Sequence, residues 1–128
     1  MGKTWPLAFA LAFALAMVAL LGACSRSPGA AEAPSAADVE RAERARPSDA
    51  RLAQRYEQAC LLCHARPDSG APLSHHAPSW KPRLERGLPA LVQSVQAGKG
   101  GMPAGGLCAD CSREDYESLT RFMSGPTP

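Results

Sequence analysis

The chain has few aromatic residues and little net charge. Aromatic side chains make up 5% of its 128 residues, and its formal net charge at pH 7 is +2. So small a charge excludes the strongly basic surface that is typical of a nucleic-acid-binding protein. Beyond an apolar first segment and a Pro/Ala-rich second segment, about eighty residues remain, and a domain of that size usually needs a staple, a metal or a cofactor to be stable.

The one long apolar run of the sequence extends from Leu7 to Leu21 and is too short and too Ala-rich to indicate a membrane span. Lys3 precedes it and Gly22-Ala23-Cys24 follows, which is the layout of a signal peptide. Leu-Gly-Ala-Cys resembles the lipobox of bacterial lipoproteins, so we expect residues 1–23 to be a lipoprotein signal peptide and Cys24 to carry the lipid. An ordinary secretory signal or an uncleaved anchor would leave Cys24 incidental. Every alternative places the domain outside the cytoplasm, here the periplasm.

Residues 24–47 are expected to form the lipidated N-terminus and a disordered tether. They are mostly Ala, Pro, Ser, Glu and Arg, and cannot bury enough apolar surface to fold by themselves. Within them, residues 38–46 are expected to form at most a transient helix, in which Glu40 and Arg44 are an i,i+4 pair. The folded domain is therefore expected to occupy residues 48–128.

Residues 60–64 read Cys-Leu-Leu-Cys-His, a motif of two cysteines followed by a histidine. Cys60 and Cys63 are three positions apart and share one helical face, so both thiols can add to the two vinyl groups of a single haem. The imidazole of His64 then lies under the ring, where a nitrogen can bind the iron. The alternatives are a thioredoxin-like redox pair, a zinc knuckle or chance. We expect one covalently bound haem c.

Three segments of the domain carry helical signals. They are residues 49–60, which Ser48 can cap, residues 87–97, which Gly98 ends, and the residues from Ser112 onward, where Asp115 completes a capping box. The last helix is expected to pack on the first. The fold class predicted is all-α, with about three to four helices around the haem.

Residues 67–82 contain four prolines and are expected to form an irregular loop that covers the haem edge. Trp80 is the expected contact, because its ring adds buried area and its N–H can find a polar partner. His75 and His76 are possible iron ligands, although adjacent histidines in a polar loop are more often solvated.

Met102 is the strongest candidate for the second iron ligand. It stands alone among the glycines of residues 98–106, where it has no helix face to fill. Its thioether can approach a metal closely, and a Met/His pair is a common low-spin haem ligation. The alternative is a loop methionine tucked into the core. Met123 lies at a core position of the last helix and is a weaker candidate.

A second pair, Cys108 and Cys111, completes a pattern that would usually indicate a four-thiolate zinc site. The 44 residues between Cys63 and Cys108 exceed the usual spacing, and a secreted chain favours oxidised thiols. A zinc-binding structural module and a thiol-disulfide oxidoreductase remain the alternative functions.

Together these motifs resemble the class I cytochromes c, specifically their cytochrome c-five group. The resemblance covers residues 56–123 and rests on Cys-Leu-Leu-Cys-His, on Gly70-Ala71-Pro72, on Trp80 with Arg83 and Gly87, and on Gly-Gly-Met-Pro-Ala-Gly-Gly-Leu-Cys-Ala-Asp-Cys-Ser-Arg-Glu-Asp-Tyr at residues 100–116. It implies a small class I cytochrome c fold in which Cys60 and Cys63 anchor the haem and His64 and Met102 are the axial ligands. It also implies a Cys108–Cys111 disulfide, and a position for Trp80 and Arg83 near the haem propionates.

The function that this resemblance implies is a single-electron carrier, here a membrane-tethered periplasmic monohaem cytochrome c. It is not expected to be an enzyme, because both axial positions are filled and the chain supplies no general base or open metal site. Its expected partners are a redox protein that donates and one that accepts, such as an oxidase or a reductase complex, and the membrane through the lipid. The chain departs from the group at Ser74-His75-His76 and at Ala104, where a second proline often follows the first.

Overall fold

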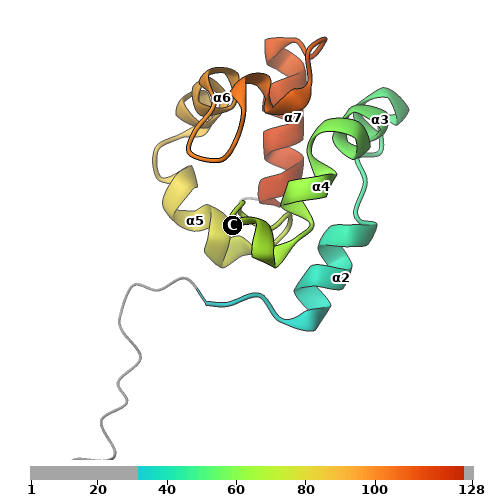
Figure 1. Ribbon diagram of the computed structural model, residues 1–128, viewed down its shortest axis with the longest axis vertical. Coiled ribbons are helices and arrows are strands. Elements are labelled where there is room, and N and C mark those ends of the chain that lie inside the picture. The colour runs from blue at the N-terminus through green and yellow to red at the C-terminus, as the bar shows by residue number, and fades with distance from the viewer. Residues whose placement is uncertain (1–31, 126–128) are drawn as a thin grey trace, which may run out of the picture. The chain divides into compact units, whose positions relative to one another are not determined.

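The computed structural model describes residues 32–125, and these residues form helices and no strands (Figure 1). The helices are α2 (Ala36–Arg44), α3 (Ala50–Ala59), α4 (Leu61–His64), α5 (Ala77–Leu84), α6 (Leu88–Ala97) and α7 (Arg113–Ser124), with 3₁₀ turns η1 (Pro67–Ser69) and η2 (Ala104–Leu107). The predicted all-α class is confirmed.

The expected signal peptide and Cys24 lie outside the described residues. None of the described helices combines the length and the apolar composition needed to cross a bilayer.

The main core joins α3 to α5, α6 and α7. Its buried members are Tyr56, Trp80, Leu91, Leu119 and Met123. The ring of Tyr56 meets that of Phe122 edge to face, with centroids 5.0 Å apart. The expected packing of the last helix on the first is therefore confirmed, and each large apolar side chain buried here contributes about 1.5–3 kcal/mol.

The starts of α3 and α7 follow their capping residues. At α7, Ser112 Oγ accepts a hydrogen bond from the Asp115 amide, and the Asp115 carboxylate accepts one from the Ser112 amide, so the predicted capping box is confirmed. At α3 the cap is Asp49 and not Ser48, because the Asp49 carboxylate accepts from the Leu52 amide at 2.8 Å. A carboxylate at this position also interacts favourably with the positive end of the helix dipole.

The segment expected to be an irregular loop, residues 67–82, contains most of the helix α5, and that prediction is wrong. Pro78 lies in the first turn of α5, where the missing amide hydrogen has no helical partner to lose. Pro82 lies further along and costs the helix one backbone hydrogen bond. The prediction was wrong because it counted the prolines. Their positions within the helix decide whether the helix can form.

Part of the expected tether is an ordered helix, α2. Its capping box joins Ser35 to Asp38, and the expected Glu40–Arg44 ion pair is present. Ala42 is completely buried, in a small apolar cluster with Ala65 and Leu73, and with Val39 and Leu61 at its margin. The prediction of disorder is wrong for Ala36–Arg44, because it considered this segment alone and a nine-residue helix gains most of its stability from packing.

Candidate functional site

His64 is the last residue of α4 and is buried, with 6% of its surface exposed. Its Nδ1 lies 2.8 Å from the Pro72 carbonyl oxygen, and since a carbonyl only accepts, Nδ1 carries the proton and donates. Burial lowers the pKa of His64, the bond to Pro72 opposes this, and nearby Arg83 lowers the pKa further. The imidazole is therefore neutral at neutral pH, with the lone pair of Nε2 free for a metal ion.

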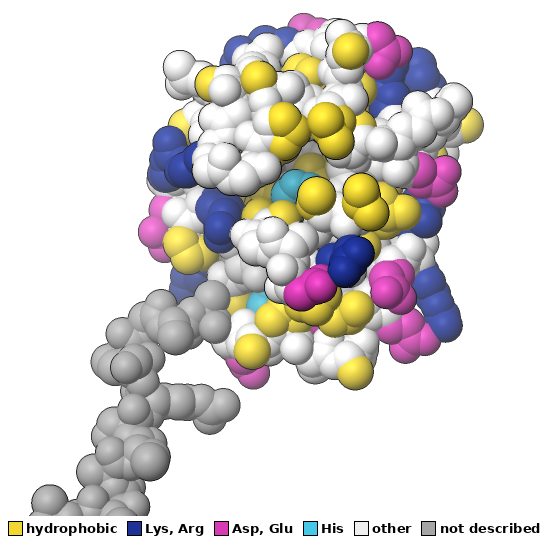
Figure 2. Space-filling model, in the orientation of Figure 1, with side chains coloured by type: hydrophobic (Ala, Val, Ile, Leu, Met, Phe, Trp, Pro, Cys, Tyr) yellow, Lys and Arg dark blue, Asp and Glu magenta, His cyan; other side chains and the backbone are white. Residues whose placement is uncertain are grey.

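Cys60 and Cys63 belong to the same short segment as His64. Cys60 lies at the junction of α3 and α4, and its carbonyl accepts hydrogen bonds from the amides of Cys63 (3.3 Å) and His64 (2.9 Å). Both cysteines are free; Cys60 is half-buried and Cys63 exposed. Figure 2 shows a hollowed face on which a histidine side chain is flanked by hydrophobic side chains. A buried neutral imidazole in the same short segment as two free thiols fits a covalently attached haem.

The state of the Cys60 thiol disfavours thiol-disulfide exchange. Burial, with a further contribution from Cys63, raises the pKa of Cys60 to about 11. The reactive form in exchange is the thiolate, which a catalytic cysteine reaches through a lowered pKa. Cys60 therefore lacks the lowered pKa that the attacking thiol of a redox-active CxxC requires.

Met102 ends a tight turn and lies close to two glycines, Gly98 and Gly106. Its backbone makes two hydrogen bonds with Lys99, of 3.0 and 3.1 Å. A Cβ added at Gly106 would lie 2.9 Å from the Met102 methyl carbon, and one added at Gly98 would lie 3.0 Å from the Met102 carbonyl oxygen. Both glycines have positive φ, which other residues rarely adopt. Gly106 leaves space for the Met102 side chain that the side chain of any other residue there would occupy.

Trp80 and Arg83 lie next to His64. The Trp80 ring stacks on the imidazole with centroids 5.9 Å apart and planes 23° from parallel. Its N–H donates to the Leu73 carbonyl at 2.8 Å, so the expected polar partner is a backbone carbonyl. The Arg83 guanidinium donates to the Ser79 carbonyl. Contact of either residue with haem propionates stays a prediction.

Comparison with known proteins agrees with this geometry. The family model described as cytochrome c oxidase, cbb3-type, subunit III matches residues 47–123. The chain is also 34% identical over 68 residues to a cytochrome c5 of Ectopseudomonas mendocina and to one of Azotobacter vinelandii, a match that covers 52% of this chain and 78% and 82% of those proteins. The chain belongs to the class I c-type cytochromes. Within them it falls in the cytochrome c5 group, whose members carry electrons and bind one covalent haem c.

The two adjacent histidines of this cytochrome are not solvated, which corrects the sequence-based expectation. His76 is 4% exposed, and its Nδ1 lies 2.6 Å from Ser79 Oγ. His75 is half-buried, and its ring meets Phe122 edge to face at 4.8 Å. Its amide donates to the Met123 carbonyl at 2.7 Å. Both histidines therefore take part in packing between the start of α5 and its neighbours.

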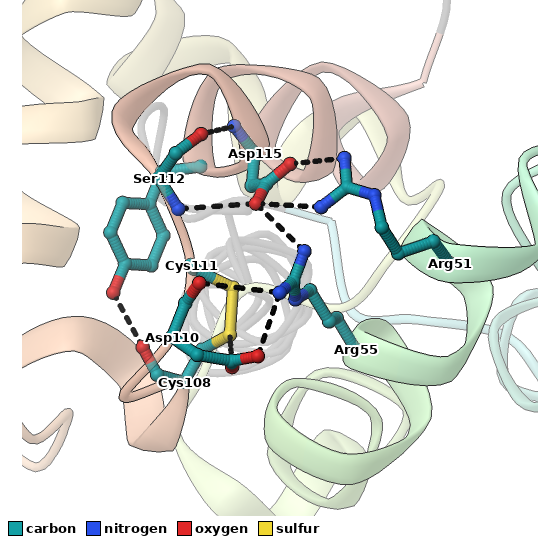
Figure 3. Close-up of a disulfide and its surroundings, with 8 residues drawn as sticks. Arg51, Arg55, Cys108, Asp110, Cys111, Ser112 and Asp115 are labelled. Carbon is teal, nitrogen blue, oxygen red and sulfur yellow. Dashed lines mark hydrogen bonds and ion pairs between the residues drawn. A yellow bond between two sulfur atoms is a disulfide. The ribbon is translucent and has the colours of Figure 1, made fainter.

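The second CxxC of the cytochrome is a disulfide in the structure. The Cα atoms of Cys108 and Cys111 are 5.4 Å apart and their Sγ atoms are bonded (Figure 3). The Tyr116 hydroxyl donates to the Cys108 carbonyl at 2.8 Å, which fixes the loop to α7. A four-thiolate zinc site cannot form while two of its thiols are in a disulfide.

Two arginines of α3 bind the start of α7, one of them also binds this loop, and sequence reasoning missed both. Asp115, almost completely buried, accepts hydrogen bonds from Arg51 at 2.6 and 2.9 Å and from Arg55 at 3.0 Å (Figure 3). Arg55 also donates to the Asp110 carboxylate at 2.7 Å. The four-residue spacing of the arginines, which places them on one helix face, was the available signal. The loop that follows Met102 is thus held by the helix that leads into Cys60.

Proposed function

We propose that the chain is a membrane-tethered periplasmic monohaem electron carrier in which Cys60 and Cys63 attach the haem and His64 and Met102 bind its iron. The observation that carries the proposal is the buried imidazole of His64. Its Nδ1–H is engaged by the Pro72 carbonyl, so that Nε2 is the ligand nitrogen. Two free cysteines belong to the same short segment. The haem supplies the one-electron couple of its iron.

Each residue of the site has a distinct part in tuning that couple. The hydrogen bond to Pro72 fixes the orientation of His64 and makes it a stronger electron donor, which favours ferric iron. The thioether of Met102 favours ferrous iron relative to a second imidazole. Burial of His64 and Trp80 keeps water away from this side of the site. None of these parts requires a substrate or a proton transfer.

A haem stain of the denatured protein tests the attachment. The parent and the Cys108→Ala/Cys111→Ala double variant should both stain, because only a thioether-bound haem survives denaturation. The Cys60→Ala/Cys63→Ala variant should lose the stain completely. An unstained parent would refute the proposal and favour the thiol-disulfide oxidoreductase.

The Cys108–Cys111 disulfide is expected to add modest stability. Closing so small a loop is worth about 2 kcal/mol in the chain-entropy model. Cys108→Ala should therefore fold and keep its haem but melt at a lower temperature, since Tyr116 and Arg55 still hold the loop. Thermal unfolding of parent and variant measures the difference. Two free thiols found in the unreduced mature parent would show that the bond does not form.

The lipid anchor rests on Leu21-Gly22-Ala23-Cys24 and is tested by Cys24→Ser. The variant should leave the membrane fraction or keep its signal peptide, whereas the parent should remain with membranes until detergent is added. A variant that fractionates and migrates like the parent would contradict lipidation. Because α2 begins at Ala36, only residues 25–35 remain as tether, and they can reach at most roughly 40 Å.

The proposed partners are a periplasmic electron donor and an electron acceptor, such as an oxidase or a reductase complex. Among the described residues, the exposed large apolar side chains are Leu62 (68%) and Leu107 (66%). Leu62 lies between the two attachment cysteines, and Leu107 lies in the segment after Met102. Exposed apolar groups beside the redox centre are suited to a transient contact with another protein.

A further inference from the structure

Helix α2 lies outside residues 47–123, the part of the chain that the family model matches. Its packing is nevertheless specific. Ala42 has no exposed surface, and together with Val39 it covers Ala65 and Leu73. Ala65 directly follows His64, and Leu73 directly follows Pro72. The helix therefore packs on the neighbours of both partners in the hydrogen bond that orients the imidazole.

The segment under α2, residues 72–74, is connected to the site at each position. The Pro72 carbonyl accepts from His64 Nδ1 at 2.8 Å, and the Leu73 carbonyl accepts from Trp80 at 2.8 Å. The Ser74 amide donates to the His64 carbonyl at 2.7 Å. Leu73, the central residue, is 1% exposed and has its side chain in the cluster that Ala42 closes. Movement of Leu73 would shift the acceptors on which His64 and Trp80 depend.

The other end of α2 is connected to α3, the helix that leads into the first attachment cysteine. Arg46, two residues beyond α2, pairs with Glu57 of α3 at 2.6 Å. The guanidinium of Arg46 also lies 5.9 Å from the centre of the Tyr56 ring. The hydroxyl of Tyr56 in turn is 2.9 Å from Ser74 Oγ. The segment of residues 72–74 is thus held from α2 on one side and from α3 on the other.

We infer that α2 is a positioning element for His64. Val39 and Ala42 hold Leu73 in place, and the Pro72 carbonyl thereby keeps its hydrogen bond with the Nδ1–H of the imidazole. Without α2, Leu73 and Ala65 would face water, and water would compete for the Pro72 carbonyl. When this hydrogen bond is weaker, the imidazole is a weaker electron donor to the iron. Ferric iron is then stabilised less. This inference rests on the proposed role of His64 as an iron ligand.

The experiment compares Ala42→Gln with Ala37→Gln in the haem-containing protein. Ala37 is exposed on the same helix, so both variants replace a helical alanine by glutamine and only Ala42→Gln disturbs the buried face. Solvent exchange of the His64 Nδ1–H and the Ser74 amide, measured by NMR, should become at least tenfold faster in Ala42→Gln, and the reduction potential should rise. Ala37→Gln should match the parent in both measurements. Val39→Ser, which removes volume instead of adding it, should change them in the same direction as Ala42→Gln.

The exchange rate of the Leu119 amide, in the core of α7, distinguishes a loss of positioning from a loss of general stability. If Ala42→Gln accelerates exchange at Leu119 by the same factor as at His64, or leaves His64 exchange and the potential unchanged, the inference is overturned. Failure of the proposed function is recognised separately in the parent. There, a His64 ring without iron-induced shifts in the oxidised protein would show that His64 is not the ligand, whatever the variants do.

Discussion

Replacement of Met102 by alanine is expected to abolish the weak sulfur-to-iron charge-transfer band at the red end of the visible spectrum of the oxidised protein. Loss of the thioether should open the sixth position to water or added small ligands. Met102→His should also lose the band but keep the iron low-spin. The reduction potential of Met102→His should fall by a few tenths of a volt, within the roughly 0.8 V that axial ligands span. Visible spectroscopy and redox titration measure both effects.

Two glycines provide a matched test of the turn around Met102. Gly106→Ala should weaken the same band, because its Cβ would meet the Met102 methyl carbon at 2.9 Å in a backbone conformation with positive φ. Gly101→Ala should leave the band unchanged, since no atom lies within 4 Å of its added Cβ. If Met102→Ala keeps the parent's spectrum and potential while His75→Ala or His76→Ala changes them, two histidines bind the iron and the assignment of Met102 fails.

Removal of the Asp115 carboxylate is expected to lower the free energy of unfolding by about 3 kcal/mol. The Asp115 side chain is 6% exposed, caps α7 and pairs with Arg51 and Arg55. Asp115→Ala would leave the mostly buried guanidinium of Arg55, whose side chain is 18% exposed, with one carboxylate fewer. Denaturant unfolding measures the loss.

Asp110 offers the matched control for this prediction. Its carboxylate pairs with the same Arg55 but is 76% exposed, so Asp110→Ala should cost much less stability than Asp115→Ala. If Asp110→Ala and Asp115→Ala lowered the free energy of unfolding equally, burial of the Arg55–Asp115 pair would contribute nothing to stability. Both variants should retain the haem, since neither carboxylate belongs to the attachment motif.

The sequence alone determined the family, the haem and the candidate residues that hold it. Attachment needs two thiols and an imidazole within five consecutive residues, and chemistry that is local in the chain leaves a local pattern. The same holds for the capping box of Ser112 and Asp115, which requires only a spacing of three residues. The isolation of Met102 among glycines was also visible, although the space that Gly106 leaves for its methyl group was not.

The tertiary structure decided every feature that depends on partners distant in the chain. Helix α2 forms because Ala65 and Leu73 cover its apolar face, and neither residue is close to it in sequence. The contact of His75 with Phe122 and the connection from Arg55 to Asp115 likewise join segments that are 47 and 60 residues apart. The tautomer of His64 follows from the position of one carbonyl eight residues further on. Apart from the four-residue spacing of the two arginines, such contacts leave no signal in the sequence, because packing and hydrogen bonding act between surfaces that only the folded chain brings together.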